Sequence, residues 1–240
     1  MASAALLSVV GRMDMMLVAL SRQPKYRGLI PFLQTYYLVT KAVTAAGMQR
    51  RTFYDQPAAL ERLDSVFADL YFKPLERWLA GQRRQPAPWK TYYTYCQSGH
   101  GNAFVELLLG INAHINGDLP LALNTARYRA AKDFNRIDAL LLSVIPEVMQ
   151  FLTKHYHDYL SVGAFLLPSL TEQEFHHIIV RWRHQAWDNA QQINANNLSA
   201  ARKKLHTQTE AVAKQLVEIF SSPQQLVRRR AELETLRVVL

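Results

Sequence analysis

The chain of 240 residues contains one cysteine, Cys96, which excludes a disulfide-stabilised scaffold and a zinc site built from several cysteines. Charged residues make up only 20% of it, and glycine and proline are few, at 9 and 10 residues. These values exclude a disordered chain, a collagen and a coiled-coil rod. Nowhere do 18 uncharged apolar residues follow one another, so the sequence predicts no membrane-spanning helix.

The sequence also lacks the motifs of several common classes. It has no glycine-rich phosphate loop, no nucleophile elbow, no dinucleotide fingerprint and no recognised DNA-binding motif. The alternation of valine, isoleucine and threonine that is typical of strands is missing as well. What is present is a chain that is 49% apolar, enough to bury a core, with helical spacing of its apolar residues nearly throughout.

We therefore expect an all-α fold, a single bundle-like domain of about eight to ten helices. Residues 1–195 are expected to form the core domain that carries the site. The more polar residues 196–240 are expected to form a C-terminal helical hairpin packed on it. The aromatic stretch Trp89–Tyr95 follows Arg83 and Arg84, and we expect it to be a loop that caps the bundle or a site for single-stranded nucleic acid or a polar lipid head group. The expected helices are Ala4–Ser21, Pro31–Gly47, Pro57–Ala80, Asn102–Asn116 closed by Gly117, one capped by Asp133, one from a Thr171/Glu174 capping box to about Asn194, and one each after Ser199 and Ser222.

Basic residues outnumber acidic ones by 28 to 19, a net charge of +9 that favours anionic partners. Charge alone does not predict nucleic-acid binding. The first residues, Met1–Val10, lack the basic start of a secretory signal, so we expect a cytoplasmic protein of bacterial type. The basic surface would also suit peripheral contact with anionic lipid.

The most unusual stretch is Gly110–Pro120, which places four polar side chains in seven positions of an apolar run. Burying each of them without a partner would cost about 1–3 kcal/mol. They therefore form either a satisfied polar core network or a metal or catalytic site. His114 and Asp118 are four residues apart, so on a helix they share a face. The four polar residues are Asn112, His114, Asn116 and Asp118.

A second histidine and aspartate pair, His184 and Asp188, has the same spacing. An imidazole and a carboxylate on adjacent helical turns make half of a site for Zn²⁺ or a similar cation. Two such pairs could meet across a bundle core, although the second pair could equally be a surface pair. Arg183 and Trp187, also four apart, could stack as packing or as an anion clamp.

Two families resemble the chain at these residues. The segment Asn112–Ala122 looks like the central signature of an uncharacterised bacterial family of unknown function, and that resemblance covers most of residues 5–195. The segments His114–Asp118 and His184–Asp188 are similar to two stretches of the zinc-dependent phospholipase C and single-strand-specific nuclease superfamily. Those enzymes are all-helical, and both stretches supply zinc ligands there.

The second resemblance implies that His114, Asp118, His184 and Asp188 bind a divalent metal ion, zinc first, and that a metal-activated water attacks a phosphoester. Asn124 stands where that superfamily has a further histidine ligand. The candidate catalytic residues are Asn112, Asn116 and Arg183. The predicted function is thus metal-dependent hydrolysis of a phosphoester in a lipid-like or small amphipathic substrate.

Two alternatives from other classes stay open. One is a non-catalytic helical protein whose polar centre orients a hydrophobic ligand. The other is a helical di-iron type oxidative enzyme, since Glu174 and His177 have the spacing of a di-iron carboxylate motif. That enzyme would also use Glu106, His114 and Asp118.

Overall fold

Helices form the regular structure of the computed structural model, which describes residues 4–50, 52–98, 102–156, 172–194 and 196–220. No strand occurs in these ranges, which confirms the all-α prediction. The elements are α1 (Ala4–Ser21), η1 (Pro24–Leu29), α2 (Ile30–Gln49), α3 (Pro57–Leu79), α4 (Ala87–Gln97), α5 (Ala103–Ile111), η2 (Asn112–Asp118), α6 (Leu119–Thr125), α7 (Ala131–His155), α9 (Glu172–Gln191) and α10 (Leu198–Phe220).

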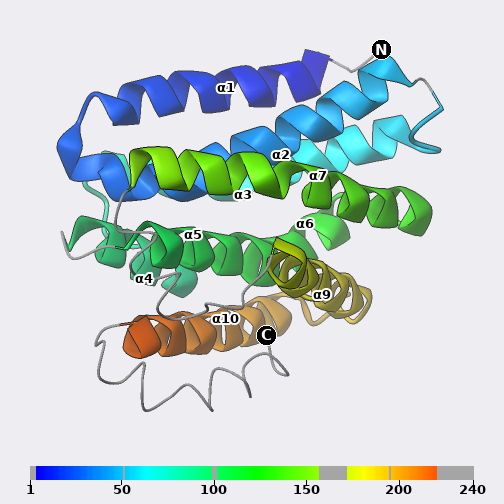
Figure 1. The fold of residues 1–240 in the computed structure, drawn as a ribbon. Helices are drawn as coiled ribbons and strands as arrows, with labels where there is room; N and C mark the ends of the chain where they lie inside the picture. Colours follow the sequence, from blue (N-terminus) through cyan, green and yellow to red (C-terminus); the bar gives the residue numbers. More distant parts are fainter. Residues whose placement is uncertain (1–3, 51, 99–101, 157–171, 195, 221–240) are drawn as a thin grey trace.

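A continuous helical run, α5–η2–α6, occupies the middle of the fold. Helices α2, α3, α4, α9 and α10 all contact this run, while α1 packs on α2 and α3. In Figure 1, α1 and α10 accordingly lie at opposite edges of the molecule. No helix in the described ranges is long and apolar enough to cross a membrane.

The sequence of α5 explains its central place. Every residue from Ala103 to Ile111 is buried, and eight of these nine residues carry no ionisable group. Asn102 begins the helix as expected, because its side-chain oxygen accepts hydrogen bonds from the backbone N–H groups of Phe104 and Val105. A Cβ atom on Gly110 would overlap the ring of Phe32, so glycine allows α2 to pack closely here.

The expected helix end at Gly117 is wrong. The chain continues through η2, a π-helix, directly into α6, and the N–H of Leu119 donates to the carbonyl of His114, five residues back. Gly117 keeps a helical conformation, because positive backbone φ angles are confined to Gly81 and Arg127 among the described residues. The polar motif thus lies in a rare helical form that is frequent at functional sites.

Two further expectations are corrected by contacts between distant residues. Asp133 does not cap its own helix, which begins at Ala131; its carboxylate accepts hydrogen bonds from the backbone N–H groups of Asp55 and Gln56, where α3 begins. The stretch expected to be a loop, Trp89–Tyr95, lies inside α4 because three of its aromatic rings are fully buried in the core.

The C-terminal part is described to residue 220. Helix α10 packs against α4 and η2, and α9 ends at Gln191, three residues before the expected end. Ser222 and the second helix of the expected hairpin lie outside the described residues. Thr171 and the side chain of Glu174, which form the expected capping box, lie outside them as well.

Candidate functional site

The predicted pair His114 and Asp118 forms a direct contact in the core. The Nδ1 atom of His114 lies 3.1 Å from Oδ2 of Asp118, and the indole Nε1–H of Trp89 donates to the same oxygen at 3.0 Å. Both side chains are almost fully buried, with 2% and 4% of the residue surface exposed. Burial raises the pKa of Asp118 and lowers the pKa of His114, which favours the uncharged form of both groups.

Aromatic rings enclose the imidazole of His114. It stacks on Phe67 with ring centroids 3.6 Å apart, and Tyr36 meets it edge-on at 4.6 Å. Its Nε2 atom has no hydrogen-bond partner within the described part of the chain. A buried polar atom of this kind costs about 1–3 kcal/mol. The imidazole is therefore held by packing and by Asp118 on one side.

The two asparagines of the motif are also paired. Asn116 donates from Nδ2 to the side-chain oxygen of Asn112, and Asn112 donates from Nδ2 to the backbone carbonyl of Thr209 in α10, both at 2.9 Å. These bonds link η2 to the C-terminal part of the chain. Together with the histidine pair, they satisfy most of the motif's polar atoms inside the protein, as a polar core network does.

The second predicted pair has other partners. His184 lies with Nε2 2.9 Å from Asp138 of α7, and the buried Arg183 donates to the other carboxylate oxygen of Asp138 and to the carbonyl of Phe134. The guanidinium of Arg183 lies over the ring of Phe134, not over Trp187. His184 and Asp188 are exposed, whereas the first pair is buried.

Within the described part of the chain, the two predicted pairs do not come together into one cluster of ligands. No three histidine, cysteine, aspartate or glutamate side chains within the described ranges come together in an arrangement that could hold one. The first histidine pair is enclosed by aromatic rings and the second faces solvent. Of the residues of the di-iron alternative, His177 is exposed and His114 is buried in the core.

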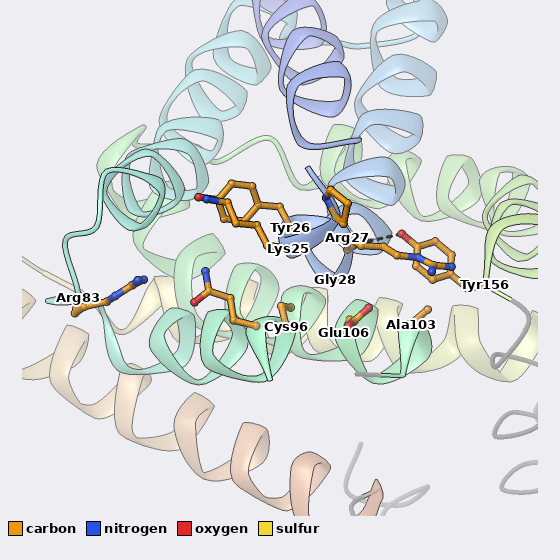
Figure 2. A pocket seen from close by; sticks show the side chains of 11 residues that line it. Lys25, Tyr26, Arg27, Gly28, Arg83, Cys96, Ala103, Glu106 and Tyr156 are labelled. Atoms are coloured by element: carbon orange, nitrogen blue, oxygen red, sulfur yellow. Dashed lines mark hydrogen bonds between the residues drawn. The ribbon is translucent and has the colours of Figure 1, made fainter. Parts of the chain in front are cut away.

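An open pocket lies beside this core, between η1, α4, α5 and the end of α7 (Figure 2). Its volume is about 640 Å³, within the range of ligand sites in proteins. We call it the Glu106 pocket. The side chains that define its chemistry are Lys25, Arg27, Arg83, Cys96, Glu106 and Tyr156.

Glu106 is the acidic group of this pocket and the ionisable residue of α5. It is 4% exposed, and no hydrogen bond or ion pair holds its carboxyl group within the described part of the chain. Burial raises its pKa to about 7, against an opposing effect of Arg27. Near pH 7 the carboxyl group is therefore present in both its neutral and its ionised form.

Gly28 leaves space next to the carboxyl group of Glu106, and contacts between Arg27 and Tyr156 fix one side of the pocket. A Cβ atom on Gly28 would lie 2.5 Å from Oε1 of Glu106 and 2.8 Å from the carbonyl of Cys96. Arg27 donates to the carbonyl of His155 at 2.8 Å, and its guanidinium lies 4.9 Å from the ring centre of Tyr156. The hydroxyl of Tyr156 in turn donates to the carbonyl of Arg27. Figure 2 shows Arg27 lying along Tyr156 at one side of the pocket.

Of the basic residues of this pocket, Arg83 is a candidate from the sequence because it precedes the aromatic stretch, whereas Lys25 and Arg27 are not. Lys25, Arg27 and Arg83 come from two segments separated by more than 50 residues, and no motif joins them. Glu106 was considered only as part of a di-iron site. Its signal was nevertheless present, because it is a lone acidic residue in an apolar run.

The fold and site define an all-α protein with a buried polar π-helix and an adjoining polar pocket. The chain belongs to the family of unknown function DUF5995, whose model matches residues 6–223. The family membership confirms the predicted relation to an uncharacterised family. Neither a curated protein nor a solved structure matches the chain.

Proposed function

We propose that this chain binds a small organic anion, of the phosphate ester, sulfonate or carboxylate kind, in the Glu106 pocket. The observation that carries the proposal is a buried carboxyl group without a hydrogen-bond partner in the described part of the chain, in a pocket that three basic residues, Lys25, Arg27 and Arg83, also line. With three basic side chains and one acidic side chain, the pocket carries a net positive charge, which attracts anions. An anion is accommodated best when Glu106 is protonated, because the neutral carboxyl group donates a hydrogen bond and repels no charge.

This arrangement couples binding to a proton. Since the pKa of Glu106 is about 7, the carboxyl group is mostly neutral at pH 6 and mostly ionised at pH 8. If only the neutral form binds, affinity for an anion of constant charge falls about tenfold over this interval. Binding then takes up a proton near neutral pH.

The test is a titration of the full chain with sulfate, whose charge is constant over this range, followed by the amide NMR signals of Lys25, Arg27 and Gly28. We expect saturable shifts and an affinity about tenfold higher at pH 6 than at pH 8. The variant Glu106→Gln should bind sulfate with no pH dependence. The control Asp64→Asn should keep it, because Asp64 also has a pKa of about 7 through burial but does not line the pocket.

Two further variants locate the binding. Lys25→Gln should weaken sulfate binding several-fold, whereas Lys41→Gln, which removes another lysine that lies over a tyrosine ring, should not. Gly28→Ala should abolish binding, because the added methyl group meets Glu106, whereas Gly11→Ala adds a methyl group in open space. No saturable shift at the pocket, or equal effects of both lysine variants, would overturn the proposal.

Zinc-dependent hydrolysis of a phosphoester, with His114, Asp118, His184 and Asp188 as ligands, stays a separate proposal that rests on the sequence resemblance. Elemental analysis of protein purified without chelator or affinity metal tests it. One or two equivalents of zinc, lost in a His114→Ala, His184→Ala double variant, would support it. Iron lost on His177→Ala would support the di-iron alternative instead.

A further inference from the structure

A second cavity adjoins the Glu106 pocket. It lies between α1, the start of α2 and the end of α7, and its volume is about 620 Å³. Its lining is mainly apolar, in contrast to the first pocket. We call it the apolar cavity, defined by Leu17, Val18, Leu20, Ile30 and Phe151.

The two cavities share one wall. Pro24, Arg27 and Tyr156 line both of them. Arg27 and Tyr156 are held against each other by the cation–π contact and by the hydrogen bond from the tyrosine hydroxyl, so this boundary is defined. A polar site and an apolar site therefore adjoin at these three residues.

We propose that the bound anion is amphiphilic, with its charged head in the Glu106 pocket and an unbranched alkyl chain in the apolar cavity. This inference rests on the proposed function, since it needs an anion in the first pocket. The occupant of the apolar cavity follows from continuity, because an alkyl group attached to an anion near Arg27 reaches apolar surface directly beyond that residue. Burial of the chain then adds hydrophobic free energy to the electrostatic attraction of the head.

The test is a series of sodium 1-alkanesulfonates, from methanesulfonate to octanesulfonate, titrated into the full chain by calorimetry at pH 6 and below micelle-forming concentrations. Their charge is constant, so chain length is what changes. Affinity should rise about two- to fourfold with each added methylene group. Lys25→Gln should weaken every member by a similar factor, because it acts on the head.

A matched pair of variants tests the location of the chain. Val18→Gln changes a 45% exposed side chain of the apolar cavity, and Leu7→Gln changes a 49% exposed side chain of the same helix outside it. Val18→Gln should weaken octanesulfonate about threefold while leaving methanesulfonate within a factor of two. Leu7→Gln should change neither.

The outcomes separate the two proposals. If sulfate and methanesulfonate bind but affinity does not depend on chain length, the anion pocket stands and the amphiphile inference is overturned. If octanesulfonate binds independently of Lys25 while sulfate binding depends on Lys25, the alkyl chain binds without its head in the Glu106 pocket, and the amphiphile inference alone is overturned. If octanesulfonate loses affinity equally in Val18→Gln and Leu7→Gln, the chain lies outside the apolar cavity and the inference fails.

Discussion

The helical run α5–η2–α6 contains two sets of buried polar side chains, which differ in their hydrogen bonding. In η2, the polar side chains bind one another, Trp89 and α10, and aromatic rings fill the remaining space. In α5, a few residues earlier, Glu106 has no such partner and faces an open pocket. The polar cluster of η2 is thus largely satisfied by hydrogen bonds inside the core, whereas the carboxyl group of Glu106 faces a pocket, where we propose that a ligand binds.

The comparison predicts opposite consequences for substitutions at the two places. Asp118→Ala should lower the free energy of unfolding by about 3 kcal/mol, because it leaves the Trp89 indole N–H without its acceptor and Nδ1 of His114 without its partner. Denaturant unfolding measures this loss. Asp188→Ala, at an exposed position, is the control and should change stability little. A stable Asp118→Ala protein that no longer binds a ligand or a metal would contradict the structural role of the network.

Glu106→Gln should instead make the protein more stable at high pH. The folded-state pKa of about 7 lies above the ordinary value, so ionising this buried group costs stability as pH rises from about 5 to 8. Relative to wild type, the variant should gain about 2 kcal/mol between these pH values. Unfolding curves at pH 5 and pH 8 measure the gain. Asp14→Asn, at an exposed position, should show no gain in stability. An equal gain in that variant would contradict the raised pKa of Glu106 as the cause.

His184→Gln should have the smallest effect. Its side chain is about half exposed and contacts Asp138, so its loss should cost under about 1 kcal/mol. Sulfate affinity should stay unchanged. Stability and zinc content should be measured on the same preparation of His184→Gln. If wild-type protein contains zinc and this variant does not, His184 and the His114 pair would belong to one metal site.

Much of the fold could be predicted from local patterns. The bounds of α1 match the expected Ala4–Ser21, because apolar spacing begins it and the approach to Pro24 ends it. The start of α5 agrees with the expected start at Asn102, whose side chain caps the helix through a local interaction. The contact of His114 with Asp118 followed from their helical spacing.

The errors and omissions come from contacts between distant residues. Asp133 was assigned to its own helix, but its partners are backbone groups almost 80 residues earlier. The rings of Trp89–Tyr95 looked like a surface loop because their burial depends on α2, α3 and η2. The Glu106 pocket joins five segments of chain, so neither its volume nor its charge could be obtained from spacing.

The π-helix also sets the angular phase of the central run. A hydrogen bond from Leu119 to His114 spans five residues, one more than in an α-helix. One residue of an α-helix corresponds to about 100° of rotation. The extra residue therefore turns the faces of α6 relative to those of α5. In the run α5–η2–α6, Glu106 therefore lies on the side of η1 while α6 packs against α9. In an uninterrupted α-helix of this sequence, the angle between these two faces would be different.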